Sequence, residues 1–142
     1  MIVIQEYVRD WMTRDIITTT PTTPLGHARK LMIENNIRRL PVVGDEGLVG
    51  IITRNDIHEA EPAEMSSVSI WELHQLLSRL YVKGEMTPNP ITVTPDDTIG
   101  HAANLMLKNK VGGLPVVAAN GQLVGIITES DIFRLVVREL GE

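Results

Sequence analysis

The chain contains two copies of one unit, and this duplication constrains its fold more than any other feature. Residues 12–57 and 86–132 align with one extra residue, Gln122, and 25 of the 46 aligned positions are identical. Each copy ends in nearly the same segment, GIITRNDI at residues 50–57 and GIITESDI at residues 125–132. Agreement of this extent indicates a repeated structural unit. The sequence therefore predicts two halves with the same fold.

Polar residues are repeated as well as apolar ones. Thr53 and Asp56 return as Thr128 and Asp131, whereas the two residues between them change. One explanation is structural, because Thr and Asp are common at the first turn of a helix. A helix cap requires only one such residue, however. The repetition of both residues therefore favours a functional role for the pair as well.

Composition limits the class of protein. The chain has 142 residues, of which 43% are hydrophobic, and this is enough for one domain with a normal core. Each half is small, so we expect the two halves to bury their apolar faces against each other. The sequence has no cysteine, which excludes disulfides and cysteine-based metal sites. It shows neither a signal peptide nor an apolar run of ~18 residues, which predicts a cytoplasmic protein with no membrane association.

Charge and motifs argue against two other classes. The net charge of -5 opposes nucleic-acid binding, which requires clustered Lys and Arg to neutralise phosphates. The four histidines have no spacing that suits a metal site, and none of the common hydrolase or P-loop motifs is present. We therefore expect a non-enzyme without catalytic or metal-binding residues, in which the histidines are surface or packed side chains. These histidines are His27, His58, His74 and His101.

The same order of elements is predicted in each copy. The β-branched runs at residues 16–20 and 91–94 predict short strands. A helix follows each of them, with Thr23 and Asp97 as the expected N-caps. Apolar residues at helical spacing form one face of each helix. They are Leu25, Ala28, Leu31 and Met32 in the first copy, and Ile99, Ala102, Leu105 and Met106 in the second.

A hairpin and a second helix complete the copy. Residues 37–43 and 48–53 predict one hairpin, and residues 111–117 and 123–128 predict the other. A helix should then begin near Asp56 or Asp131. The order strand, helix, strand, strand, helix predicts a small α/β layer that occurs twice. The predicted division is repeat 1 at residues 8–60, a linker and helix at 61–80, and repeat 2 at 81–140. The linker contains Pro62, its helix follows Ser69, and Trp71 is expected in a core or dimer contact.

Four motifs occur in the same order in both copies: Met-Thr, Ile-Thr-x-Thr-Pro, Leu-Pro-Val-Val and Gly-Ile-Ile-Thr-x-x-Asp-Ile. This pattern resembles a tandem pair of cystathionine-β-synthase (CBS) domains and covers nearly the whole chain. The resemblance implies two β-α-β-β-α repeats that pack through their sheets with pseudo-twofold symmetry. It also implies two clefts between the repeats that bind adenosine-containing ligands such as AMP, ADP, ATP or S-adenosylmethionine.

The chemistry of such a ligand suits the repeated residues. A carboxylate can accept hydrogen bonds from both ribose hydroxyls, which suits Asp56 and Asp131. Thr53 and Thr128 could donate to a phosphate near a helix N-terminus. By the resemblance, cleft A would combine Ile16, Ile37, Arg38 and Arg39 with Thr128 and Asp131. Cleft B would combine Pro90, Ile91, Val111, Gly112 and Gly113 with Thr53 and Asp56. Asp15, Pro41, Pro115 and Arg54 complete the candidate set.

The two clefts are not equivalent in charge. Arg38 and Arg39 place positive charge beside cleft A, where the second copy has Gly112 and Gly113. We expect cleft A to bind the more highly phosphorylated or tighter ligand, because guanidinium groups pair with phosphate oxygens. The alternative is that both arginines lie on a solvated face.

The predicted function is a stand-alone regulatory module that senses an adenine nucleotide for an unknown effector protein. The nucleotide would be a regulatory ligand, and no cofactor is required. We expect a homodimer that forms through the helices containing Leu25 and Ile99, with Leu31, Met32, Leu105 or Met106 left exposed. Two alternatives are a structural dimerisation module with empty clefts and a nucleic-acid-binding accessory protein. The repeated Thr and Asp argue against the first, and the net acidity argues against the second.

Overall fold

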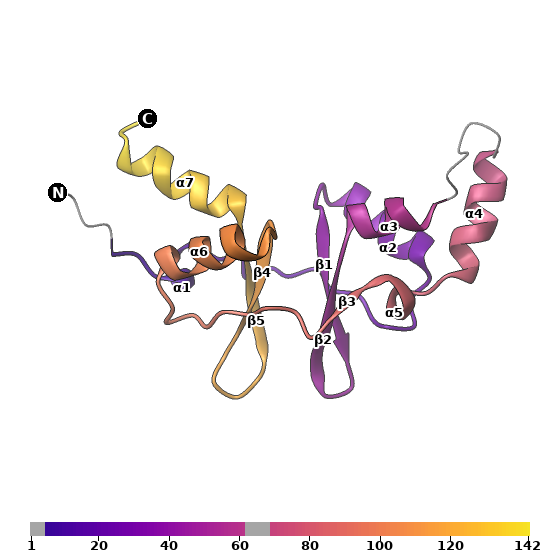
Figure 1. Cartoon of the computed structure of the whole chain (residues 1–142), viewed down its shortest axis with the longest axis horizontal. Helices are drawn as coiled ribbons and strands as arrows, with labels where there is room; N and C mark the ends of the chain where they lie inside the picture. The colour runs from indigo at the N-terminus through magenta and orange to yellow at the C-terminus, as the bar shows by residue number, and fades with distance from the viewer. Residues whose placement is uncertain (1–4, 62–68) are drawn as a thin grey trace. The chain divides into compact units, whose positions relative to one another are not determined.

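A computed structural model describes residues 5–61 and 69–142 of the chain (Figure 1). The chain divides into two compact units. Unit 1 comprises Met1–Ile16 together with Ile91–Glu142, and unit 2 comprises Ile17–Pro90. Each unit has its own cluster of buried apolar residues. The units therefore differ from the predicted repeats. Unit 1 holds most of the second copy together with residues 1–16 from the start of the chain, and unit 2 holds most of the first copy together with the residues up to Pro90.

Unit 2 is built on a three-stranded antiparallel sheet. β1 (Arg39–Gly44) pairs with β2 (Gly47–Thr53), and β2 pairs with the short strand β3 (Thr87–Pro88). Gly47 has a φ of 113°, a conformation that favours glycine and allows the tight turn between β1 and β2. The predicted hairpin is confirmed.

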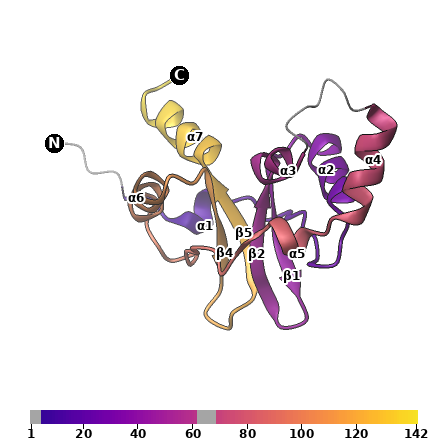
Figure 2. The ribbon, with the colours of Figure 1, turned by 45° about the vertical axis from the view of Figure 1, so that its right-hand side comes forward.

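The described part of unit 2 contains four helices: α2 (Leu25–Glu34), α3 (Arg54–Ala60), α4 (Ile70–Arg79) and α5 (Val82–Glu85). The hydroxyl of Ser69 accepts a hydrogen bond of 3.1 Å from the backbone N–H of Glu72, so Ser69 caps α4 as expected. α4 lies alongside α2 (Figure 2), and its Leu77 joins the core of the unit. Trp71 is 69% exposed, so it does not belong to that core. Pro62 of the predicted linker lies outside the described residues.

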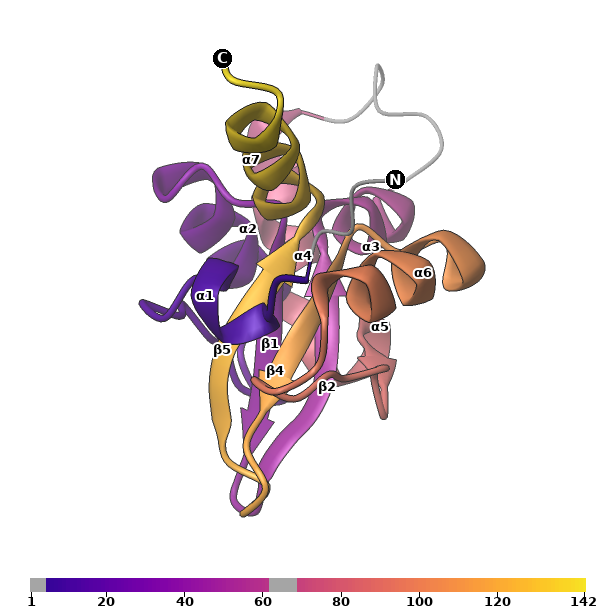
Figure 3. The ribbon, with the colours of Figure 1, turned by 90° about the vertical axis from the view of Figure 1, so that its left-hand side faces the viewer.

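Unit 1 repeats most of these elements, but none of its described helices corresponds to α4 (Figure 3). Its hairpin consists of β4 (Gly113–Val117) and β5 (Leu123–Thr128), and its helices are α1 (Val8–Trp11), α6 (Ile99–Asn109) and α7 (Glu129–Glu139). The segment from the start of the chain pairs with β5, because Thr13 and Ile126 exchange backbone hydrogen bonds of 2.9 and 3.0 Å. The N-terminal segment thus lies beside β5 as β3 lies beside β2.

This pairing explains two of the repeated motifs. A Cβ atom added to Gly125 would lie 2.7 Å from the sulfur of Met12 and 3.0 Å from the carbonyl oxygen of Thr13. A Cβ atom added to Gly50 would lie 2.6 Å from the sulfur of Met86. The Met-Thr motif therefore packs on the glycine of the Gly-Ile-Ile motif in each unit, and only glycine leaves room for this approach.

The predicted strands at residues 16–20 and 91–94 are wrong in extent. Each contributes a single parallel bridge, between Thr19 and Val42 and between Val93 and Val116. Pro21 and Pro95 follow these segments and have no backbone N–H, so the strand pairing cannot extend through them.

The predicted N-caps of α2 and α6 are wrong by one residue. The cap positions are Pro24 and Thr98, and the hydroxyl of Thr98 accepts from the N–H of His101 at 3.1 Å. Thr23 and Asp97 instead close the preceding turn. Their side chains accept hydrogen bonds from the backbone N–H groups of residues 20 and 94, at 3.3 and 2.8 Å respectively.

Thr19 offers a test of core packing. It is only 4% exposed, and its hydroxyl has no hydrogen-bond partner among the residues that the structure describes. The equivalent residue of the other copy is Val93. A buried unsatisfied hydroxyl is costly, so we expect Thr19→Val to raise the free energy of unfolding by about 1 kcal/mol. Urea denaturation would measure the change. Thr20→Val is the control, because that exposed hydroxyl is hydrogen-bonded to Thr23 and its loss should bring no gain. A less stable T19V variant would contradict the expectation.

Among the described helices, none is long and apolar enough to cross a membrane.

Candidate functional site

The repeated Thr and Asp lie at the start of a helix in both units, directly after the second strand of the hairpin. In unit 2 the N–H of Thr53 donates to Asp56 Oδ2 at 2.8 Å, and the N–H of Asp56 donates to Thr53 Oγ1 at 3.1 Å. This reciprocal pair of bonds is a capping box, which uses both residues. The argument that a cap requires only one of the two residues is therefore wrong. Their proposed contact with a ligand stays a prediction.

The second copy of the pair makes more contacts. The N–H and the hydroxyl of Thr128 both donate to Asp131 Oδ2, at 2.9 and 3.2 Å. Arg134 Nη1 donates to the other oxygen, Oδ1, at 2.6 Å. Asp131 is only 3% exposed, whereas Asp56 is half-buried. The two carboxylates have the same place in the fold but different surroundings.

The loop before each hairpin lies against the helix start of its own unit. The carbonyl oxygen of Arg38 accepts from the N–H of Arg54 at 2.8 Å, and that of Gly112 accepts from the N–H of Glu129 at 3.1 Å. Arg39 is paired with Thr53 across the hairpin. Arg38 is exposed and Arg39 is partly exposed, which leaves the phosphate-binding and solvated-face interpretations of these arginines both open.

The structure therefore groups most candidate residues into two sets. The unit 2 set is Ile37, Arg38, Arg39, Pro41, Thr53, Arg54 and Asp56, and the unit 1 set is Val111, Gly112, Gly113, Pro115, Thr128 and Asp131. Pro41 and Pro115 are buried within β1 and β4. Asp15 and Ile16 end the first segment of unit 1, Pro90 ends unit 2, and Ile91 resumes unit 1. Clefts A and B each combine residues of both units, and both stay predictions.

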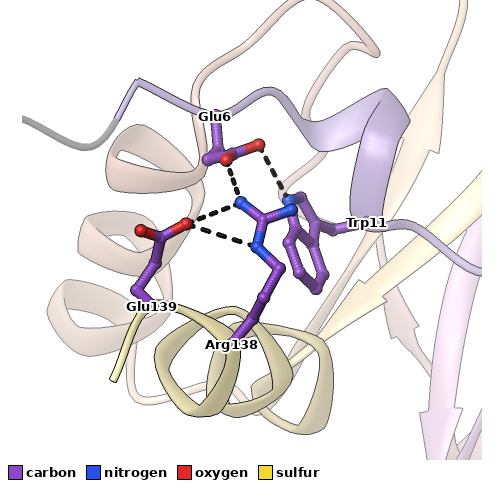
Figure 4. Close-up of polar contacts among 4 residues, drawn as sticks. All are labelled: Glu6, Trp11, Arg138 and Glu139. Atoms are coloured by element: carbon purple, nitrogen blue, oxygen red, sulfur yellow. Dashed lines mark hydrogen bonds and ion pairs between the residues drawn. The ribbon is translucent and has the colours of Figure 1, made fainter. Parts of the chain in front are cut away.

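A polar cluster at the other end of α7 joins it to the N-terminal segment (Figure 4). Arg138 pairs with Glu6 and with Glu139, and its guanidinium carbon lies 4.7 Å from the centre of the Trp11 ring. The indole N–H of Trp11 donates to Glu6 Oε2 at 3.2 Å. The hydrogen bonds from Trp11 and then Arg138 lower the pKa of Glu6 below its ordinary value of 4.5. Sequence reasoning missed this cluster, because no local pattern connects residues so far apart in the chain.

The lowered pKa of Glu6 makes this contact depend on pH. A carboxyl group whose pKa is lower in the folded state stabilises the fold above its unfolded pKa, and this contribution is lost as the pH falls through the folded value. We expect Glu6→Gln to be less stable than the wild type at pH 7, and the difference to shrink as the pH falls below about 4. Thermal melts of both proteins across this pH range would measure it. A difference that is the same at every pH would contradict the expectation.

An apolar groove of about 510 Å³ lies between α6 and α7 of unit 1. Leu107 and Phe133 on its walls are 80% and 65% exposed. Met32 and Met106 were two of the residues expected at such a surface. Met32 is fully buried in the core of unit 2, so that expectation is wrong for it, whereas Met106 belongs to the core of unit 1 and also lines the groove. Leu31 and Leu105 are partly buried against the same cores. The groove is lined by Ala103, Met106, Leu107, Lys110, Val111, Glu129, Ile132 and Phe133.

The family model of the CBS domain matches residues 8–62 and 77–138. The two matched stretches correspond to the two hairpins with their helices and their Thr-x-x-Asp helix starts. The chain therefore belongs to the CBS domain family and contains a tandem pair of these domains. This confirms the family and the repeated α/β fold that the sequence predicted. A CBS domain-containing protein of Dictyostelium discoideum is 34% identical over 134 residues, which cover 94% of this chain and 92% of that protein.

Two solved structures of CBS pairs contain ligands. The CBS domain pair of protein MJ0100, in complex with 5′-methylthioadenosine and S-adenosyl-L-methionine, is 31% identical with a TM-score of 0.79. The match covers 96% of this chain and 99% of the MJ0100 chain. CBSX2 in complex with AMP is 31% identical with a TM-score of 0.77. The match covers 95% of this chain and 98% of the CBSX2 chain.

Other relatives are longer and include enzymes. Inosine-5′-monophosphate dehydrogenase of Korarchaeum cryptofilum is 38% identical over 123 residues, which cover 87% of this chain. The chain spans 23% of that enzyme and 46% of protein MJ1225 of Methanocaldococcus jannaschii. CBS domains thus occur both in small proteins and in enzymes whose other parts have no counterpart in this sequence.

Proposed function

We propose that this chain is a regulatory module that binds an adenosine-containing ligand and transmits its binding to an effector protein. The candidate ligands are AMP, ADP, ATP and S-adenosylmethionine. The observation that carries this proposal is the match to two CBS pairs that hold AMP in one case and methylthioadenosine with S-adenosylmethionine in the other. Both matches cover 95% or more of this chain. The module acts without catalysis and requires no cofactor.

The carboxylate of Asp56 supports the proposal chemically. Its Oδ2 accepts one hydrogen bond from Thr53, and its Oδ1 accepts none among the described residues. An ionised carboxylate has about four lone-pair sites, so Asp56 can still accept from both hydroxyls of a ribose. The capping box fixes the position of this carboxylate before a ligand arrives, which reduces the entropic cost of binding.

The remaining candidate residues complete the proposed sites. In the proposal, cleft A joins the loop at residues 37–39 with Thr128 and Asp131, and cleft B joins the loop at residues 111–113 with Thr53 and Asp56. The exposed guanidinium of Arg38 is suited to a phosphate of the ligand in cleft A. Glycine at residue 112 offers no such group to cleft B.

The proposal is tested first by thermal unfolding in the presence of candidate ligands. A ligand that binds only the native state must raise the melting temperature by mass action. We expect an increase with at least one of AMP, ADP, ATP and S-adenosylmethionine, and none with cytidine monophosphate at the same concentration. If none of the adenosine compounds stabilises the protein, a structural module with empty clefts becomes the better explanation.

We further propose that the chain acts as a homodimer in the cytoplasm and that the groove between α6 and α7 forms the contact. Exposed apolar surface of this kind is typical of protein interfaces. In unit 2 the residues equivalent to Leu107 and Phe133 are Ile33 and His58. The groove-wall position that Phe133 occupies in unit 1 is therefore less apolar in unit 2. In a twofold dimer the surface of this groove would meet its own copy.

A further inference from the structure

The two candidate carboxylates differ in how many acceptor positions the protein itself occupies. Asp56 accepts one hydrogen bond on Oδ2 and none on Oδ1 among the described residues. Asp131 accepts two on Oδ2, from Thr128, and one on Oδ1, from Arg134. Since a carboxylate oxygen has about two lone-pair sites, Oδ2 of Asp131 is full and Oδ1 has one position left. A diol that needs two acceptors finds them at Asp56 but not at Asp131.

Two contacts make this difference: the hydroxyl of Thr128 adds a second hydrogen bond on Oδ2, and Arg134 binds Oδ1, which accepts none at Asp56 among the described residues. The position of Arg134 also distinguishes the two copies. The equivalent residue of the first copy is Glu59, which accepts a hydrogen bond of 3.1 Å from Asn55 and does not contact Asp56. The side chain of Arg134 is 66% exposed, whereas that of Asp131 is 4% exposed. A largely exposed guanidinium thus pairs with a buried carboxylate.

From this geometry we infer that Arg134 is a specificity-determining residue that competes with the ribose of the ligand for the carboxylate of Asp131. This inference rests on the proposed function. In the ligand-free protein Arg134 occupies Oδ1. A ligand must displace the guanidinium before both of its ribose hydroxyls can bind, and the cost of that displacement lowers the affinity of the site. The site at Asp56 has no such competitor.

The displaced guanidinium also gives the Asp131 site a preference among ligands. Once released from Oδ1, Arg134 remains charged and exposed at the edge of the site, where it can pair with a phosphate. A ligand with a phosphate can recover part of the displacement cost, whereas adenosine cannot. Arg134 therefore selects against unphosphorylated adenosine at Asp131, in addition to any contribution of Arg38 and Arg39.

Calorimetry with adenosine tests the competition directly, because adenosine carries the ribose diol without a phosphate. The Asp131 site is isolated in the full chain by Asp56→Ala. In that background we expect Arg134→Gln to tighten adenosine binding by up to about fivefold, the range expected for removal of a partly exposed ion pair. The matched control is Glu59→Gln in an Asp131→Ala background, which should leave adenosine binding at Asp56 unchanged.

The outcomes separate the inference from the function on which it rests. Tighter adenosine binding by the R134Q variant, with no such gain for AMP, supports the competition. Unchanged or weaker adenosine binding overturns it, because Arg134 would then only support α7 or contact the ligand. Far-ultraviolet circular dichroism of each variant excludes loss of folding as the cause. If wild-type protein binds neither adenosine nor AMP, the proposed function fails and this inference fails with it.

Discussion

Removal of the carboxylates at Asp56 and Asp131 is expected to lower the affinity for the adenosine ligand by about tenfold to a hundredfold at each site. A hydrogen bond to a charged group contributes roughly 1.5 to 3 kcal/mol, which corresponds to this range of affinity. Calorimetry of Asp56→Ala, Asp131→Ala and the double variant, with the ligand that stabilises the wild type most, would measure the loss. The two single variants should each lose one site.

The capping boxes complicate the alanine variants, because the loss of a cap costs about 0.5 to 2 kcal/mol of stability. Asp56→Asn separates the two roles. Its amide oxygen can still accept from the N–H of Thr53, but it lacks the charge that strengthens a bond to a ribose hydroxyl. Asp45→Ala, an exposed change in the turn of the same hairpin, is a control for general effects. Unchanged affinity in the double variant would remove both carboxylates from the site.

Much of the fold could be predicted because it depends on local patterns that occur twice. Alternating apolar segments with a glycine turn predict the hairpins, and the helical spacing from Leu25 to Met32 predicts a buried helix face. The short first strands were overestimated, because the β-branched runs carry the propensity for a strand while the neighbouring prolines prevent it from pairing. Propensity alone does not show whether a partner strand is within reach.

The assignment of the N-terminal segment to unit 1 could not be predicted from the same patterns. The contact of Met12 and Thr13 with Gly125 joins residues that are far apart in the chain, and it is visible in the sequence only as a repeated Met-Thr and a repeated glycine. Neither motif indicates its partner. The same limit applies to Glu6 and Arg138, which meet only after the N-terminal segment has packed on α7.

At the candidate site, in contrast, the sequence does contain the relevant pattern. Interpretation of the repeated Thr and Asp as more than a helix cap overlooked that one kind of cap uses both residues. Thr and Asp three residues apart at the start of a helix match the spacing of a capping box, which explains why both residues recur. Arg134, three residues after Asp131, also has the spacing of a helical ion pair. What the sequence does not reveal is that Asp131 is buried while Asp56 is half-buried, because burial depends on the packing of the whole unit.

The second large effect is expected for assembly. Light scattering of the wild type at micromolar concentration should give twice the monomer mass of 15.7 kDa. Phe133→Asp places a charge on the wall of the apolar groove between α6 and α7, where burial against a second copy would leave it without a partner. Large aromatic residues at the centre of interfaces contribute 2 kcal/mol or more. We therefore expect Phe133→Asp to raise the dissociation constant of the dimer roughly 30-fold or more.

The repeat supplies a matched control for the dimer. His58→Asp introduces the same side chain at the equivalent position of unit 2, where a histidine stands in place of the phenylalanine, and it should leave the dimer intact. Both positions are exposed on a helix, so neither change should unfold its unit. A wild-type mass of 15.7 kDa at micromolar concentration would exclude the dimer. If Phe133→Asp remains dimeric while His58→Asp dissociates, the interface lies on unit 2, and the apolar groove of unit 1 must then have another role.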